Sequence, residues 1–150
     1  MSTSGMILKK VALFNPQSAL REISNIMDSL GFNYCVDPIS DESSGFQLGI
    51  NDIECNSNFC MYIFDKPKSE YMDNDDFSWI STNLYVAILI EDLFDCEDSV
   101  LKILHKYFRL HPAEFFYAEE DWFYTKEDIE SIYDSGKWNH WCYKNPNLTQ

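Results

Sequence analysis

The stretch that most constrains the fold runs from Leu84 to Ile90, where seven apolar residues follow one another without polar alternation. This length suits a strand that is buried on both faces. Val86, Ile88 and Ile90 are β-branched, which favours a strand over a helix. A transmembrane helix needs about 20 residues. The run therefore predicts a strand at the centre of a packed domain, with no membrane span.

A helix is predicted directly after this strand. Asp95 is the expected N-cap, with Asp98 three residues further on as an acidic variant of the capping box. Glu97 and Asp98 would lie at the positive end of the helix dipole, and Pro112 ends the helix. Apolar residues recur at helical spacing and form one face, namely Val100, Leu101, Leu104, Tyr107 and Phe108.

The remaining patterns complete an α+β arrangement. Asn15 caps a helix with Pro16 at its first position, and Gly31 ends it. Thr125 with Asp128 begins a later helix that runs to about 134 and ends at Gly136. Further strands are expected at 6–14, 32–36, 45–50 and 59–65, and the segment 114–118 reads as an edge strand or an extended segment.

This order predicts a two-layer sandwich in which a mixed or mainly antiparallel sheet of about five strands is covered by two or three helices. Only the first strand–helix–strand unit is compatible with a parallel crossover. Residues 1–5 are expected to form a flexible leader. Residues 6–150 are expected to form one globular domain with an aromatic-rich C-terminal segment, because 150 residues favour a single domain.

The formal net charge of −14 is unevenly distributed along the chain. Residues 51–100 hold 12 acidic and two basic residues, which gives that third a net charge of −10. Such a field repels nucleic acid and anionic membranes and attracts basic partners. The alternative is that this negative charge only keeps the protein soluble and has no role in binding. The five cysteines cannot all pair within one chain, and no secretory segment precedes them, so reduced thiols and a cytoplasmic location are predicted.

The sequence offers little support for catalysis, and an enzyme is not favoured. His140 and Cys142 would share one face of an extended segment, but no orienting group is marked beside them. Cys55 and Cys60 lack the second ligand pair of a zinc site, and the glycine and glutamate of a calcium loop are missing after Asp73. Phosphate-binding glycine motifs are absent. We therefore expect no cofactor and no metal, and we identify no family motif.

These observations favour a protein-binding module that engages and neutralises a basic protein, as immunity proteins do. Its acidic surface would occlude the partner, with long-range charge raising the on-rate and aromatic anchors supplying affinity. The expected contacts are Asp73, Asp75, Asp76, Glu91, Asp92, Asp95, Glu97 and Asp98, with Trp79, Trp138 and Trp141 as aromatic anchors. Core packing is the alternative role of these tryptophans.

Two other functions remain open at this stage. One is a small-ligand domain or enzyme with an unmarked pocket between sheet and helices, lined by His105 or His140. The other is an acidic mimic of nucleic acid, which needs carboxylates spaced along a line. The identity of the partner and the oligomeric state are not determined by the sequence.

Overall fold

The computed structural model describes residues 4–10, 15–38, 45–64, 84–118 and 122–148. The strands are β1 (Gly5–Lys10), β2 (Asn33–Pro38), β3 (Gly45–Asp52), β4 (Ser57–Phe64), β5 (Leu84–Glu91), β6 (Phe115–Tyr117) and β7 (Phe123–Tyr124). The helices are α1 (Pro16–Leu30), α3 (Glu97–Leu110) and α4 (Lys126–Ser135), followed by the short 3-10 turns η2 (Trp141–Tyr143) and η3 (Pro146–Leu148). Among the described residues, no helix is long and apolar enough to span a membrane.

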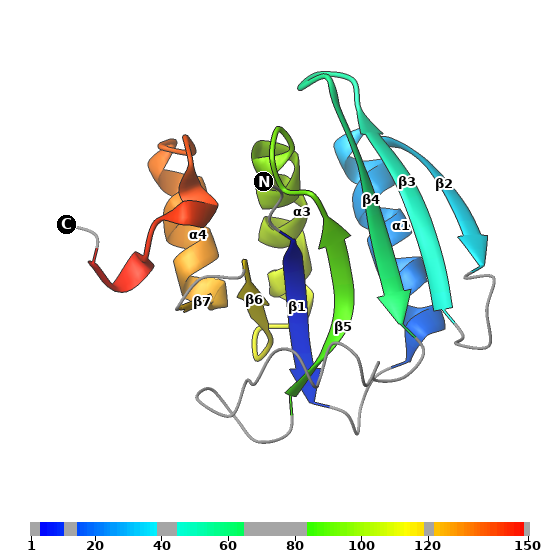
Figure 1. Cartoon of the computed structure of the whole chain (residues 1–150), viewed down its shortest axis with the longest axis horizontal. Coiled ribbons are helices and arrows are strands. Elements are labelled where there is room, and N and C mark those ends of the chain that lie inside the picture. The colour runs from blue at the N-terminus through cyan, green and yellow to red at the C-terminus, as the bar shows by residue number, and fades with distance from the viewer. Residues whose placement is uncertain (1–3, 11–14, 39–44, 65–83, 119–121, 149–150) are drawn as a thin grey trace.

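The strands form one antiparallel sheet in the order β2-β3-β4-β5-β1-β6-β7, and the three α-helices lie on one of its faces (Figure 1). The predicted α+β layout is confirmed, but the sheet has seven strands and not about five. The additional strands are the short β6 and β7. β6 lies between β1 and β7, so it is not the edge strand that was considered for 114–118. β1 and β2 are not neighbours, but the four antiparallel pairings that separate them give both strands the same direction, so the β1–α1–β2 unit is a parallel crossover that passes over three strands (Figure 1).

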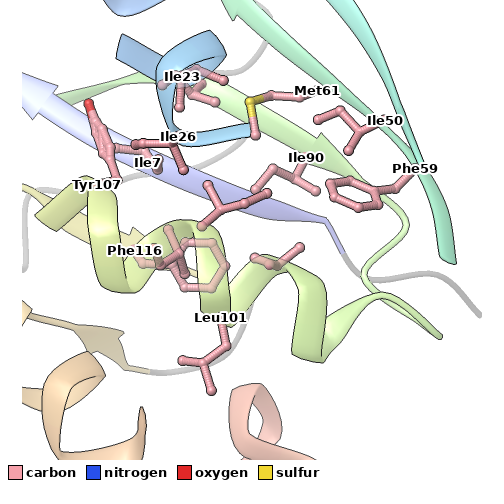
Figure 2. Packing of buried hydrophobic residues seen from close by; sticks show 14 of the residues in the cluster. Ile7, Ile23, Ile26, Ile50, Phe59, Met61, Ile90, Leu101, Tyr107 and Phe116 are labelled. Atoms are coloured by element: carbon pink, nitrogen blue, oxygen red, sulfur yellow. The ribbon is translucent and has the colours of Figure 1, made fainter. Parts of the chain in front are cut away.

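The Leu84–Ile90 run forms β5, which pairs with both β4 and β1 and is buried on both faces. Ile88 and Ile90 belong to the main core under the helices, whereas Leu84 and Val86 belong to a second cluster on the opposite face. The pairing register shifts between Ile7 and Leu8 of β1. Figure 2 shows the main core, in which residues from β1, β3, β4 and β5 meet α1 and α3.

The first helix follows its sequence signals. Asn15 accepts hydrogen bonds from the backbone N–H groups of Gln17 and Ser18, both at 3.0 Å, and Pro16 is the first residue of α1. Gly31 ends the helix in the left-handed region, with φ 76°. The predicted stop at Gly136 and the capping box of Thr125 with Asp128 are also present in α4. Local capping chemistry was therefore sufficient to define these two helices.

The strands predicted at 32–36, 45–50 and 59–65 have bounds one or two residues different, and two further boundaries differ in a way that involves tertiary contacts. Gly5, which was assigned to the leader, is already part of β1, where a Cβ atom would lie only 2.7 Å from the Phe116 ring. The N-cap of α3 is Cys96 and not Asp95, and no side chain caps this helix end. Asp95 itself has φ 70°, and its backbone O accepts a hydrogen bond from Ser57 Oγ at 2.7 Å. The predicted capping box is therefore absent, and Asp95 makes a tertiary contact through its backbone instead.

Candidate functional site

Three connecting segments meet at the end of the sheet where β5 leads into α3, at the top of Figure 1. They are the β3–β4 turn (53–56), the β5–α3 loop (92–96) and the segment 136–140 after α4. Together they frame a groove of about 650 Å³, which we call the acidic groove. It is lined by Cys55, Ser57, Phe94, Asp95, Glu97, Asp98, Gly136, Trp138, Asn139 and His140.

The segments around the groove are tied together through α3. The backbone O of Glu97 accepts a hydrogen bond from Trp141 Nε1 at 2.8 Å, and its Oε2 accepts one from Tyr143 OH at 3.1 Å. Trp138 Nε1 donates to Tyr133 O at 3.1 Å. The C-terminal segment is therefore held against the first turn of α3, which gives the groove a fixed wall.

Asp52 connects the β3–β4 turn to the same helix from beneath the groove. Its carboxylate accepts hydrogen bonds from Ser99 Oγ at 2.7 Å and from the Cys55 backbone N–H at 3.3 Å, and Lys102 Nζ lies 3.5 Å away. Burial would raise the pKa of Asp52, but these hydrogen bonds and the charge of Lys102 outweigh it and lower the pKa. Asp52 is therefore a buried, ionised anchor.

The groove concentrates negative charge without a matching base. Glu91, Asp92, Asp95, Glu97 and Asp98 lie within eight residues, and three of them line the groove, which has no lysine or arginine in its lining. None of the five forms an ion pair with a base in the described part of the chain, where the neighbouring Lys102 pairs with Asp52. Glu97 and Asp98 lie in the first turn of α3, where the positive end of the helix dipole interacts favourably with carboxylates.

Backbone conformation also distinguishes these segments. The non-glycine residues with positive φ in the described ranges are Asn56, Asp92, Asp95 and His140, with φ between 54° and 70°. Each of the three segments that frame the groove contributes at least one of them. Asn, Asp and His tolerate the left-handed region better than other side chains. The sequence therefore permits sharp local turns in all three segments, and two of these residues, Asp95 and His140, line the groove.

The segments that frame the groove also carry exposed apolar side chains. Phe94 is 63% exposed, and Ile53, in the turn that contributes Cys55, is 67% exposed. Trp138 is half-buried, with its ring 5.0 Å from that of Tyr133. Sequence reasoning missed Phe94 and Ile53, because an apolar residue in a loop is as often buried as exposed. Leu93, directly before Phe94, is fully buried.

Of the aromatic anchors predicted from sequence, Trp141 lies in the core. It is 2% exposed, and its ring packs against those of Phe116 and Tyr124 at 5.7 and 5.4 Å. A side chain with so little accessible area has no surface for a partner, so the alternative role in core packing applies to Trp141. Four further predicted contacts lie outside the described residues, namely Asp73, Asp75, Asp76 and Trp79.

The pair of His140 and Cys142 does not form a catalytic unit. His140 is exposed in the groove, whereas Cys142 is fully buried. Burial and the nearby negative charge of Glu97 raise the pKa of Cys142 to about 12, so its thiol stays protonated. In the described ranges, no three His, Cys, Asp or Glu side chains are arranged to hold a metal ion.

A second polar cluster lies at the opposite end of α3. The nearly buried Glu114 accepts hydrogen bonds from Lys9 Nζ at 2.6 Å and from Tyr107 OH at 2.7 Å. His111 lies between Glu114 and Glu22, with Nδ1 at 3.3 Å and Nε2 at 2.9 Å from their carboxylates. Because these side chains partner one another, we assign the cluster to holding β1, α1 and α3 together.

Neither a protein-family model, nor a curated protein, nor a solved structure matches this chain. The function of the acidic groove is therefore argued from its own residues.

Proposed function

We propose that the acidic groove is the docking site of a basic protein partner, and that the chain neutralises this partner by covering it. An intracellular inhibitor of a cationic toxin or nuclease, of the immunity-protein kind, is the specific form that we favour. The observation that carries the proposal is that one concave surface combines three carboxylates, with no lysine or arginine in its lining, and an exposed aromatic ring, Phe94.

The two kinds of side chain would act at different stages of binding. Carboxylates raise the association rate of a basic protein through long-range attraction. Exposed aromatic residues supply contact area once water is excluded, as binding hot spots do. Lysine and arginine have apolar stems as well as charged ends. Such a side chain could place its stem against Phe94 or Trp138 and its charge beside Asp95 or Asp98.

Neutralising the groove is expected to slow association. In the triple variant Asp92→Asn, Asp95→Asn and Asp98→Asn, asparagine keeps the size of each side chain and tolerates the positive φ of residues 92 and 95. We expect the on-rate of the partner to fall about tenfold at low salt. The partner is captured from a lysate of the native source and identified by mass spectrometry, and its association is then measured by surface plasmon resonance.

Two of these carboxylates line the groove and Asp92 lies in the loop that frames it, so the matched control changes three carboxylates outside the framing segments, by Asp28→Asn, Asp37→Asn and Glu127→Gln. Both variants raise the formal net charge of −14 by the same three units. The control is expected to retain most of the on-rate, because screening over about 8 Å limits distant charges. Equal losses in the two variants, or an on-rate that does not depend on salt, would contradict docking at the groove.

Removing the exposed ring tests the contact area separately. Phe94→Ala is expected to weaken partner binding by about 2 kcal/mol, roughly 30-fold, if Phe94 is a hot spot. The free energy of unfolding is expected to change by less than about 1 kcal/mol, because the ring is 63% exposed. The control is Leu110→Ala at the other end of α3, where the side chain is 54% exposed. Similar affinities of the two variants would exclude Phe94 as an anchor.

A further inference from the structure

Trp138, a wall of the acidic groove, is connected to a buried histidine on α3. Its Nε1–H donates to Tyr133 O at 3.1 Å, and the two rings lie 5.0 Å apart. The Tyr133 ring stacks on the His105 ring at 3.6 Å, with 4° between the planes. His105 is only 8% exposed. A continuous series of ring contacts therefore leads from α3, through α4, to the groove.

Arg109 defines the protonation state of His105. Its Nη2 lies 3.4 Å from His105 Nε2, and a guanidinium group can only donate hydrogen bonds. Nε2 is therefore the acceptor, and the proton of the neutral ring is on Nδ1. Protonating Nε2 would remove this acceptor and place a second positive charge beside Arg109 in a poorly solvated position.

The surroundings of His105 agree with a neutral ring. Burial lowers its pKa below the usual 6.5, and the positive charges of Arg109 and Lys106 on α3 lower it further. Glu130 and Asp134 on α4 act in the opposite direction, but the net shift is downward. The ring therefore becomes charged only when the pH falls below 6.5. His105 then binds a proton more readily in the unfolded chain than in the folded chain, so acidification destabilises the folded packing around this ring.

We propose that protonation of His105 loosens the contact between α3 and α4 and displaces Trp138, so that the acidic groove releases a cationic partner at acidic pH. A charged ring at this position repels the Arg109 guanidinium, and Tyr133 lies directly against the same ring. Trp138 donates a hydrogen bond to the backbone O of Tyr133, so a shift of Tyr133 also moves Trp138 in the groove. The release of a partner rests on the proposed function, whereas the displacement of Trp138 does not.

The displacement is tested by NMR on the full chain, between about pH 7.5 and about pH 5.5, in a His140→Asn background because His140 lines the groove beside Trp138. Trp138→Phe assigns the indole N–H signal of Trp138. We expect this signal to shift with the same midpoint as the His105 ring protons, and to stay in place in His105→Phe and His105→Gln. Phenylalanine keeps a ring against Tyr133, and glutamine keeps an acceptor for Arg109. The coupling would be overturned if the Trp138 signal does not move with pH, or if it moves as much in the two His105 variants as it does when His105 is present.

The release is tested with a fluorescent decalysine peptide as the cationic probe. Binding is measured in a His140→Asn background, because His140 lines the groove and asparagine tolerates its φ of 56°. We expect binding to be about fivefold weaker at the lower pH, and this change to disappear in His105→Gln. If the peptide does not bind while the Trp138 signal titrates, the proposed function fails and the coupling stands. A pH dependence of binding that His105→Gln leaves unchanged would refute the coupling.

Discussion

Trp141→Ala is expected to destabilise the protein by about 4 kcal/mol, because truncating a buried tryptophan leaves a cavity in the core. The side chain is 2% exposed and packs against Phe116 and Tyr124. The truncation also removes the hydrogen bond from Nε1 to Glu97 O, which attaches the C-terminal segment to α3. Domains of this size have stabilities of about 5–15 kcal/mol, so much of the protein's stability would be lost. Urea denaturation followed by circular dichroism measures the change.

Trp141→Phe separates packing from hydrogen bonding in this prediction. It keeps an aromatic ring in the core but removes the indole hydrogen bond to Glu97 O, so a loss of about 1–2 kcal/mol is expected. The alanine variant should therefore be the less stable of the two. If alanine and wild type unfold at the same urea concentration, Trp141 is not part of the core and its role as a partner contact must be reconsidered.

Asp52→Ala is expected to cost about 3 kcal/mol, because removing one member of a buried ion pair leaves the other charge without compensation. Ser99 Oγ and Lys102 would lose their shared acceptor, and the β3–β4 turn would lose its connection to α3. The exposed Asp28→Ala serves as the control and should change the free energy of unfolding by less than about 0.5 kcal/mol. Equal effects of the two substitutions would show that the Asp52 contacts contribute nothing.

The same carboxylate gives a pH dependence of known sign. Because the pKa of Asp52 is lowered in the folded protein, its stabilising contribution is fully present above the usual value of 3.8. This contribution is lost as the pH falls below 3.8 and through the lower pKa of the folded state. Acid unfolding of wild type and Asp52→Ala, monitored by circular dichroism, should therefore converge at low pH. Curves that stay parallel would contradict this assignment.

The elements that the sequence determined are those with a local physical cause. Seven consecutive apolar residues required a strand that is covered on both sides, which is β5 at the centre of the sheet. Asn15 with Pro16, and Thr125 with Asp128, satisfy helix N–H groups within a few residues, so the start of each helix was readable. The concentration of acidic residues at 91–98 was equally visible, because charge is a property of composition.

Tertiary structure alone decided which of these residues share a surface. Phe94 is exposed in the lining of the groove, whereas Trp141 is buried, because burial depends on which segments pack together from distant parts of the chain. The N-cap of α3 is Cys96 and not Asp95, which has a positive φ and accepts a hydrogen bond from Ser57, 38 residues away. The acidic groove is formed by three segments that are far apart in the sequence, and no local pattern of residues encodes their meeting.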